Sequence, residues 1–331
     1  RTAFYKKGFS RNIGVFMKIV FLERTTVTVG DMDLTPFDAL GEVVYCESYD
    51  KTEMRAAAAD AEVLILNKTV VDKAFFDACP KLKCICLLAT GYNNIDLVTA
   101  RERGVAVCNV PGYSTDAVAQ LVFGFFLQFA VSLNKYQASV RDGVWCASTR
   151  YTYLSWPIHE LAGKTLGIVG YGGIGKKVAQ IGNAFGMKIL VHTRTPKEDG
   201  LAEFASLTEV LRRSDFLTFH CPLTEQTKGL IGREELAMMK PTAFLVNTSR
   251  GAVVEEQALA EALNNGVIAG AGIDVLEGEP MPLQCPYRTA KNCFVTPHIG
   301  WAAEESRARL LLEVAENIRA FQNGEKRNRV D

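Results

Sequence analysis

The sequence has no excess of either charge, because its 331 residues carry 37 basic and 37 acidic side chains. A chain without a field of one sign is a poor candidate for non-specific binding to nucleic acid or to an anionic membrane. Local basic clusters remain compatible with a cofactor that carries phosphate. The balance therefore favours chemistry on small molecules, with no nucleic-acid partner.

Long uninterrupted apolar runs are also missing. The most hydrophobic stretch, residues 117–133, contains Gln120, Gln128 and Ser132. It falls short of the roughly 20 apolar residues that a helix needs to cross a bilayer. We expect a buried or interface helix here, and no membrane partner.

Cysteine is present nine times, but without the spacing of a zinc site. Most cysteines lie in apolar runs, such as Cys84 and Cys86 in KCICLL and Cys293 in NCFV. The Cys84-x-Cys86 pair follows the alternation of a strand and has no partner pair at zinc-ligand spacing. We expect buried free thiols, no metal site and a reducing, cytoplasmic compartment.

Residue 1 is not a methionine, and residues 1–16 contain four basic side chains and no acidic one. The stretch MKIVFLE that begins at Met17 is typical of a first strand. Residues 1–16 are therefore expected to be a leader or an expression-derived segment without a part in the function.

From Met17 onward, short β-rich runs alternate with helical stretches, which predicts a parallel α/β fold. The length favours two domains. A second α/β series begins after the apolar stretch at 117–133, and this half alone carries a glycine signature. The final segment has apolar residues at helical spacing and predicts an amphipathic helix, whose partner domain the pattern leaves open.

The glycine signature directly follows the apolar run Thr165–Val169 and directly precedes a helical stretch; it consists of Gly170, Tyr171, Gly172, Gly173, Ile174 and Gly175. Its first glycine permits a tight turn, its second lets the backbone approach a pyrophosphate, and its third allows the helix to pack on the strand. The helix N-terminus then offers N–H groups to phosphate. The alternative is that the glycines serve the turn only. This context predicts a dinucleotide site.

The end of the next strand lacks the acid that usually binds the ribose 2′-hydroxyl of NAD. Thr193 and Arg194 stand there instead, followed by Lys197. An arginine can pair with a 2′-phosphate, which favours NADP. The alternative is that Arg194 points to solvent while Thr193 serves NAD.

Three polar residues, Arg250, Glu279 and His298, follow apolar runs in NTSRG, DVLEGEP and TPHIG. An open α/β sheet presents its ligands at such strand ends. Taken singly, each has another reading: a surface ion pair, a turn acid and a core histidine. Together with VGYGGIG, these motifs resemble, in order and spacing, the D-isomer-specific 2-hydroxyacid dehydrogenase family, in particular its glyoxylate/hydroxypyruvate reductase and glycerate dehydrogenase branch.

The resemblance extends from Met17 to the end. It implies two Rossmann-like, doubly wound parallel-sheet domains with a cleft between them. Residues 17–113 and 299–331 would form the substrate-binding, catalytic domain, and residues 114–298 the dinucleotide-binding domain. The apolar stretch at 117–133 and Trp145 resemble the dimer-forming arm of the family, which implies a homodimer. Gln120 and Leu121 depart from an acid and a histidine that many members have.

The chemistry explains the residue types. Reduction of a 2-oxo acid needs a hydride at the carbonyl carbon, a proton for its oxygen and an anchor for its carboxylate. The arginine fork of Arg250 can hold the carboxylate and polarise the carbonyl. His298 is the expected proton donor, and Glu279 orients it and favours its charged form.

Further site residues are implied by the resemblance alone. Those expected to bind the substrate carboxylate are Thr90, Gly91 and Tyr92, for which an ordinary strand-to-helix turn is the alternative. Lys68 is a weaker candidate on other grounds, because it ends the preceding strand and would add a positive charge at the mouth of the cleft. Those expected near the dinucleotide are Cys221, Pro222, Thr227, Thr248 and Asp274, of which Asp274 would accept a hydrogen bond from the nicotinamide carboxamide.

Three other functions stay open. Some relatives use this fold as a nucleotide-sensing corepressor, which steady turnover would exclude. Larger forms of phosphoglycerate dehydrogenase carry a regulatory domain after the catalytic unit, whereas one helix and a tail are expected after His298 here. Glu279 argues against the third, formate dehydrogenase, in which a glutamine replaces the acid paired to histidine. The exact 2-oxo acid is left open.

Overall fold

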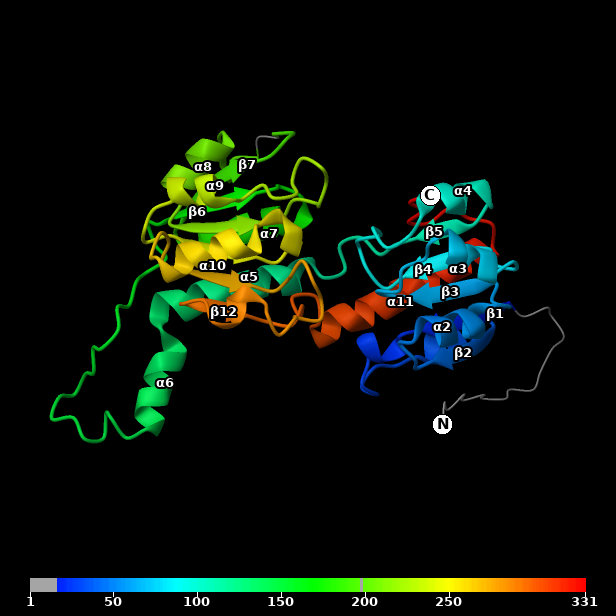
Figure 1. The fold of residues 1–331 in the computed structure, drawn as a ribbon, viewed down its shortest axis with the longest axis horizontal. Coiled ribbons are helices and arrows are strands. Elements are labelled where there is room, and N and C mark those ends of the chain that lie inside the picture. Colours follow the sequence, from blue (N-terminus) through cyan, green and yellow to red (C-terminus); the bar gives the residue numbers. More distant parts are fainter. Residues whose placement is uncertain (1–16, 197–198) are drawn as a thin grey trace. The chain divides into compact units, whose positions relative to one another are not determined.

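The computed structural model describes residues 17–196 and 199–331, so that the expected leader at 1–16 and Lys197 lie outside the described residues. The chain divides into two compact units (Figure 1). The first contains the residues up to Ser114 together with Ala302–Asp331, and the second contains Thr115–Trp301. The division expected from the sequence, after residues 113 and 298, falls close to these breaks.

The first unit is built on a five-stranded parallel sheet in the order β2-β1-β3-β4-β5. Its strands are β1 (Lys18–Leu22), β2 (Glu42–Cys46), β3 (Val63–Leu66), β4 (Cys84–Leu87) and β5 (Ala106–Cys108). Its helices are α1 (Thr35–Asp38), α2 (Lys51–Ala58), α3 (Lys73–Ala78), α4 (Leu97–Glu102) and α11 (Glu304–Gln322), with a 3₁₀ turn, η1, at Arg24–Thr26.

Local sequence explains these elements. The runs VLIL and CICL are buried at every position, as expected for strands of a parallel sheet covered on both faces. Asp50, Asp72 and Asp96 cap the N-termini of α2, α3 and α4, because each carboxylate accepts backbone N–H groups that the first turn leaves without partners. Helix α11 packs on β4 and is the amphipathic helix expected near the end of the chain.

The second unit contains a seven-stranded parallel sheet in the order β12-β11-β10-β9-β6-β7-β8. Its strands are β6 (Thr165–Val169), β7 (Lys188–His192), β8 (Glu203–Phe204), β9 (Phe216–Phe219), β10 (Phe244–Asn247), β11 (Gly270–Ile273) and β12 (Cys293–Val295). Its helices are α5 (Thr115–Val131), α6 (Leu133–Arg141), α7 (Gly173–Ala184), α8 (Leu207–Arg213), α9 (Arg233–Met238) and α10 (Glu256–Asn264), with 3₁₀ turns η2 (Gly251–Val253) and η3 (Pro286–Arg288).

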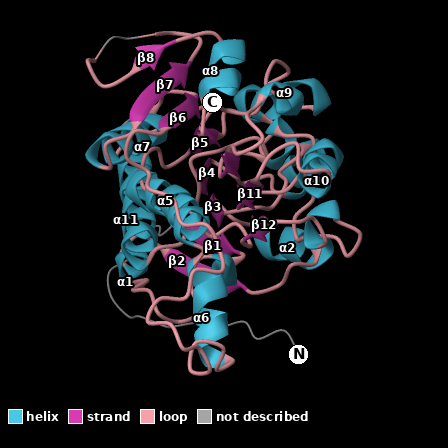
Figure 2. Cartoon of the chain, turned by 90° about the vertical axis from the view of Figure 1, so that its left-hand side faces the viewer, coloured by secondary structure: helices cyan, strands magenta, loops and turns pink. Residues whose placement is uncertain are grey.

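Helices cover both faces of this sheet (Figure 2). Helices α5 and α7 pack on one face, where Phe123, Phe126 and Val178 belong to the buried core. Helices α8, α9 and α10 enclose a second core on the other face. The predicted α/β fold class, with two Rossmann-like parallel sheets, is confirmed.

The strand order reverses between β6 and β9, because the chain proceeds from β6 to β7 and β8 on one side and then returns to β9 on the other. Such a switch point leaves a crevice outside the carboxyl ends of the strands, where ligands of open α/β sheets bind. The glycine signature begins at Gly170, directly after β6, and therefore stands at this point.

Within the described residues, no single helix is both long and apolar enough to cross a membrane. Helices α5 and α6 reach that length and composition only as a pair, and the chain bends by 59° between them.

Candidate active site

The polar residues expected to act on substrate follow three neighbouring strands. Arg250 comes after β10, Glu279 after β11 and His298 after β12. These strands are adjacent and parallel, so their carboxyl ends lie along one edge of the sheet. The topology therefore brings the three residues of the predicted triad to the same edge.

His298 and Glu279 are in direct contact. The Nδ1 atom of His298 lies 2.7 Å from Oε2 of Glu279, and both side chains are partly exposed. The other carboxylate oxygen of Glu279 accepts a hydrogen bond from the backbone N–H of Leu276 at 3.0 Å, which fixes the carboxylate. Among the residues that the structure describes, none forms a hydrogen bond with Nε2 of His298. This nitrogen is thus available to a ligand.

The backbone around His298 is held by Asp274. His298 has a φ of 55°, a conformation that L-residues rarely adopt. The buried carboxylate of Asp274 accepts hydrogen bonds from the Thr296 hydroxyl at 2.6 Å and from the N–H groups of Ile299 and Gly300, each at 2.8 Å. Burial raises the pKa of Asp274, although these hydrogen bonds act in the opposite direction. Asp274 therefore fixes the turn that presents His298.

Arg250 is partly buried, and its guanidinium donates to the carbonyl of Ser249 at 2.7 Å. The next residue, Gly251, lies directly against the backbone of Leu276 and Glu277, so that a Cβ at position 251 would overlap both. The chain after β10 thus packs on the segment that carries Glu279. Glycine in NTSRG permits this approach.

Each glycine of the dinucleotide motif has a distinct environment. Gly170 has a φ of 97° and packs against the backbone of His220 and Cys221, which follow β9. A Cβ on Gly175 would overlap the carbonyl of Gly170, whereas one on Gly172 would meet no atom within 4 Å. The first and third glycines therefore close the turn, and the second leaves the open space that a pyrophosphate needs.

Two buried polar atoms at this edge have no partner among the described residues: Oγ1 of Thr248, after β10, and Nδ1 of His220, after β9. Buried polar groups are usually satisfied, so a bound ligand is a natural source of the missing hydrogen bonds. Thr227 donates to the carbonyl of Pro222 at 2.6 Å and so shapes the turn after β9. The residues present therefore fit a dinucleotide.

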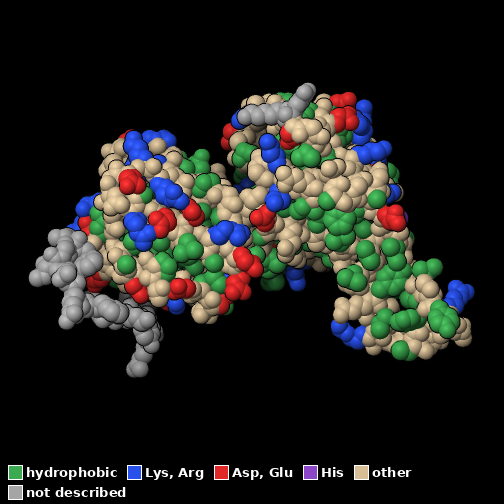
Figure 3. All heavy atoms as spheres, turned by 180° about the vertical axis from the view of Figure 1, so that it is seen from behind, with side chains coloured by type: hydrophobic (Ala, Val, Ile, Leu, Met, Phe, Trp, Pro, Cys, Tyr) green, Lys and Arg blue, Asp and Glu red, His purple; other side chains and the backbone are tan. Residues whose placement is uncertain are grey.

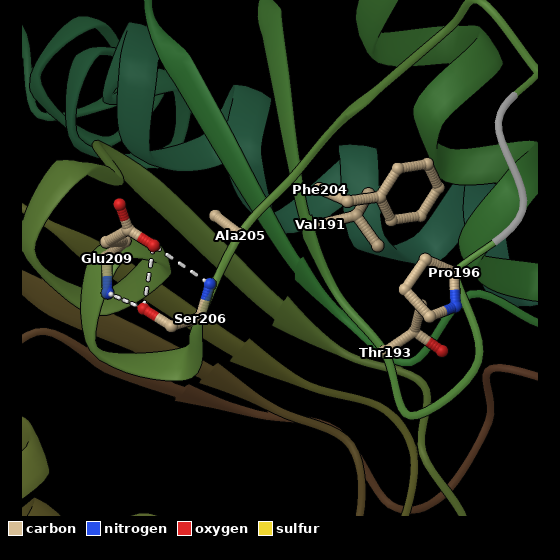
Figure 4. A pocket seen from close by; sticks show the side chains of 7 residues that line it. All are labelled: Val191, Thr193, Pro196, Phe204, Ala205, Ser206 and Glu209. Atoms are coloured by element: carbon tan, nitrogen blue, oxygen red, sulfur yellow. Dashed lines mark hydrogen bonds between the residues drawn. The ribbon is translucent and has the colours of Figure 1, made fainter.

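A pocket of about 320 Å³ opens beside the end of β7. Figure 4 shows Thr193 and Pro196 on one side of it, and Ser206 and Glu209 on the other. The Glu209 carboxylate is engaged by the N–H and the hydroxyl of Ser206, at 3.0 and 2.8 Å, in a capping box that opens α8. Arg194, which follows Thr193 in the chain, is exposed.

An acid does reach the glycine loop, from a position further along the chain than the end of β7. Asp199 accepts a hydrogen bond from the Tyr171 hydroxyl at 2.9 Å and lies 4.0 Å from the Lys176 amino group. Burial, and then the bond to Asp199, raises the pKa of Tyr171 to about 12. The β7–β8 connection is thus tied to the glycine loop by its acid.

In the first unit, Thr90, Gly91 and Tyr92 follow β4 in a loop braced by two hydrogen bonds. The Thr90 hydroxyl donates to the carbonyl of Val110 at 2.8 Å, and the Asn109 amide donates to the carbonyl of Thr90 at 2.7 Å. Lys68 follows β3 and is exposed. These residues stand at the carboxyl edge of their own sheet.

The Lys68 loop is organised by Glu23, which sequence reasoning did not single out. Glu23 is 4% exposed, and its Oε2 accepts the backbone N–H groups of Asn67, Lys68 and Thr69 at 2.9–3.1 Å. Its own φ is 54°. Since β1 and β3 flank the switch point of this sheet, Glu23 locks the loop where strand order reverses.

Comparison with known proteins decides the family. Residues 123–300 match the D-isomer specific 2-hydroxyacid dehydrogenase NAD binding domain. The chain belongs to the D-isomer specific 2-hydroxyacid dehydrogenases. It is 37% identical over 324 residues to a hydroxypyruvate reductase of Blautia hydrogenotrophica, covering 95% of this chain and all of the relative.

A further relative and a solved structure are similar to this chain over most of its length. A glyoxylate reductase of Thermococcus litoralis is 45% identical over 271 residues, which cover 80% of this chain and 81% of that protein. A crystal structure of a Thermus thermophilus protein superposes with a TM-score of 0.85 at 36% identity, covering 95% of this chain and all of that one.

As a D-isomer specific 2-hydroxyacid dehydrogenase, the chain is an oxidoreductase, and the match to an NAD binding domain establishes a nicotinamide dinucleotide as its cofactor. In this dehydrogenase the matched range contains the glycine loop, Arg250, Glu279 and His298.

Proposed function

We propose that the enzyme reduces a small 2-oxo acid of the glyoxylate or hydroxypyruvate type to the D-2-hydroxy acid, with NADPH as the favoured cofactor. The observation that carries the proposal is the 2.7 Å contact between His298 and Glu279, at the sheet edge that also holds Arg250. The similarity to the Blautia hydroxypyruvate reductase and the Thermococcus glyoxylate reductase supports the substrate class.

The chain's own residues would supply binding and proton transfer. Arg250 holds the substrate carboxylate and polarises the carbonyl through parallel N–H donors. His298 delivers a proton from Nε2 to the carbonyl oxygen, because its Nδ1 is engaged by Glu279. Glu279 keeps the ring oriented through its contact with Nδ1. The reduced nicotinamide, when bound, supplies the hydride.

We assign the remaining binding roles as follows. The backbone amides of Thr90, Gly91 and Tyr92 hold the substrate carboxylate, with Lys68 adding positive charge. On the cofactor side, the Thr248 hydroxyl serves the nicotinamide, Cys221 and Pro222 line the adenine pocket, and Thr227 keeps their turn in place. The Asp274 carboxylate already accepts three hydrogen bonds, so a further bond from the nicotinamide carboxamide would use its remaining lone pairs.

The preference for NADPH rests on Arg194, which is exposed and follows Thr193 in the chain. A charge-assisted hydrogen bond to the 2′-phosphate is worth roughly 1.5–3 kcal/mol, which corresponds to about one to two decades of discrimination. The double variant Thr193→Asp with Arg194→Ala should reverse the preference, because it removes the attraction and adds repulsion. Values of kcat/KM for NADPH and NADH decide this, and a wild-type preference for NADH contradicts it.

The function is tested by initial rates with a panel that includes glyoxylate, hydroxypyruvate, 3-phosphohydroxypyruvate and bulkier 2-oxo acids, with chiral analysis of the product. We expect steady turnover of a small 2-oxo acid to the D-product. His298→Gln should bind NADPH normally and lose turnover. Dinucleotide binding without turnover of any acid would favour the corepressor function instead, and preference for the phosphorylated substrate would favour phosphoglycerate dehydrogenase.

A further inference from the structure

Three cysteine side chains meet inside the first unit. Cys84 and Cys86 lie on β4, and Cys108 ends β5. Side chains two residues apart on a strand share a face, and Cys86 pairs in register with Cys108, so the parallel strands bring all three together. Their sulfur atoms lie within 4.8 Å of one another, and those of Cys84 and Cys86 are 3.7 Å apart.

These separations suit three sulfur ligands on one ion. A thiolate binds a small closed-shell ion such as Zn²⁺ at about 2.3 Å, so two sulfur ligands on one centre are roughly 3.8–4.0 Å apart in tetrahedral or trigonal geometry. The Cys84–Cys86 separation of 3.7 Å lies just below this range, and the other two separations do not exceed 4.8 Å. Small rotamer adjustments would therefore complete a three-sulfur site without a change in the strands.

The surroundings favour a three-coordinate, soft ion. The exposed fractions of the three residues are 0%, 0% and 2%. Their strand neighbours Ile85 and Val107 face the core below α2, α3 and α4, so the sulfur atoms face the other layer, where α11 packs on β4. Zinc with three protein ligands keeps water in its fourth position, which this burial disfavours. Sulfur-only ligation without water is typical of Cu(I).

A positively charged residue stands next to the cluster. Arg329 lies opposite Cys108 in an antiparallel bridge and is ion-paired with Asp331. Asp331 in turn accepts the backbone N–H of Val107 at 2.8 Å.

We propose that Cys84, Cys86 and Cys108 form a site for one Cu(I) ion, held by three sulfur atoms. Binding replaces the three thiol protons, which pass to solvent, and involves no oxidation or reduction. The ion would join β4 to β5 beneath α11. The proposal does not depend on the proposed catalytic residues, all of which lie outside this cluster.

The test uses the full chain with Cys146→Ser, which removes an exposed thiol. The reduced protein is titrated anaerobically with Cu(I) in competition with bathocuproine disulfonate. We expect one Cu(I) per chain, at least about 100-fold weaker binding after Cys86→Ser, and unchanged binding after Cys79→Ser, a buried cysteine of the same unit outside the cluster. No uptake, or equal uptake by the two variants, overturns the proposal.

X-ray absorption of the copper-loaded protein keeps the test decisive if Cys86→Ser fails to fold. Three sulfur neighbours around copper support the site, whereas two sulfur neighbours or nitrogen ligands overturn it. Parallel titration with Zn(II) tests the choice of ion, because tighter binding of Zn(II) than of Cu(I) contradicts the assignment to copper.

Discussion

At the scale of single residues, the sequence allowed some contacts to be predicted and not others. The pairing of His298 with Glu279 follows from motifs at the ends of neighbouring strands, and the structure confirms that they touch. The hydrogen bonds from the His298 turn to Asp274 could not be predicted. The groups that donate to the Asp274 carboxylate lie 22–26 residues further along the chain and are mostly backbone N–H groups. Backbone donors leave no signature in side-chain identity.

Arg250→Lys should lower kcat/KM for the 2-oxo acid by about two orders of magnitude and leave the fold intact. Lysine keeps the charge but loses the bidentate fork, which is worth roughly 1.5–3 kcal/mol in charge-assisted hydrogen bonds. Steady-state kinetics with circular dichroism provide the measurement. Arg233→Lys is the matched control, since Arg233 forms a surface ion pair with Glu261. Equal kinetics in both variants would remove Arg250 from the site.

His220 should make the protein more sensitive to acid. Burial lowers the pKa of His220 to about 3, whereas the unfolded chain has an ordinary histidine pKa of about 6.5. Below pH 6.5 the histidine is therefore protonated in the unfolded chain but still neutral in the folded protein. This difference lowers the free energy of unfolding as the pH falls from 6.5 toward 3. Between pH 7 and pH 5 the loss is about 2 kcal/mol.

Urea unfolding of the cofactor-free protein at pH 7 and pH 5 measures this loss. His220→Gln should show the shallower pH dependence, because the glutamine has no proton to gain. His159→Gln, at an exposed position, should behave like the wild type. Parallel pH dependence in all three proteins would show that His220 is not the titrating group.

At the scale of elements, the order of motifs predicts strands and helices well, while strand register stays hidden. The capping box at Ser206 and Glu209 and the strand–turn–helix at Gly170 can be identified from local spacing. The cysteine cluster could not, because Cys108 joins Cys84 and Cys86 only through the pairing of β4 with β5. A ligand set that is spread over two strands has no fixed spacing in the sequence.

Substitutions at two glycines of the loop should affect different properties, one of them cofactor binding and the other the stability of the fold. Gly172→Ala should leave the free energy of unfolding nearly unchanged and raise the KM for the dinucleotide at least about tenfold, because the added methyl group enters open space that the phosphates need. Gly175→Ala should instead destabilise the fold by roughly 1–3 kcal/mol, because its Cβ overlaps the carbonyl of Gly170. Denaturant titration and cofactor kinetics distinguish the two, and similar effects on both quantities would contradict the assignment.

At the scale of the whole molecule, the segment from α6 to residue 158 exposes an unusual amount of apolar surface. Figure 3 shows hydrophobic side chains gathered on this arm. Its large exposed apolar residues are Leu133, Val140, Val144, Trp145, Tyr151, Leu154 and Ile158. A contiguous exposed apolar patch marks an interaction site. This supports the proposal that the arm joins two copies of the chain into a homodimer.

Leu154→Glu should weaken this dimer at least about tenfold, because a charge replaces an apolar contact in the interface. Leu283→Glu is a close control, since both leucines are 76% exposed and both belong to the second unit. Sedimentation velocity over a range of concentrations measures the effect. A monomeric wild type, or equal dissociation of both variants, would refute the arm as the interface.

The route of the chain has a consequence for biosynthesis. The chain leaves the first unit after Ser114 and returns to it at Ala302. A ribosome therefore makes the five strands of this unit early and its helix α11 last. The second unit is contiguous and emerges in between. In the nascent first unit, the face of β4 that carries Cys84 and Cys86 therefore stays uncovered until the whole second unit has been translated. Chaperones or thiol-reactive agents would meet this protein most readily in that interval.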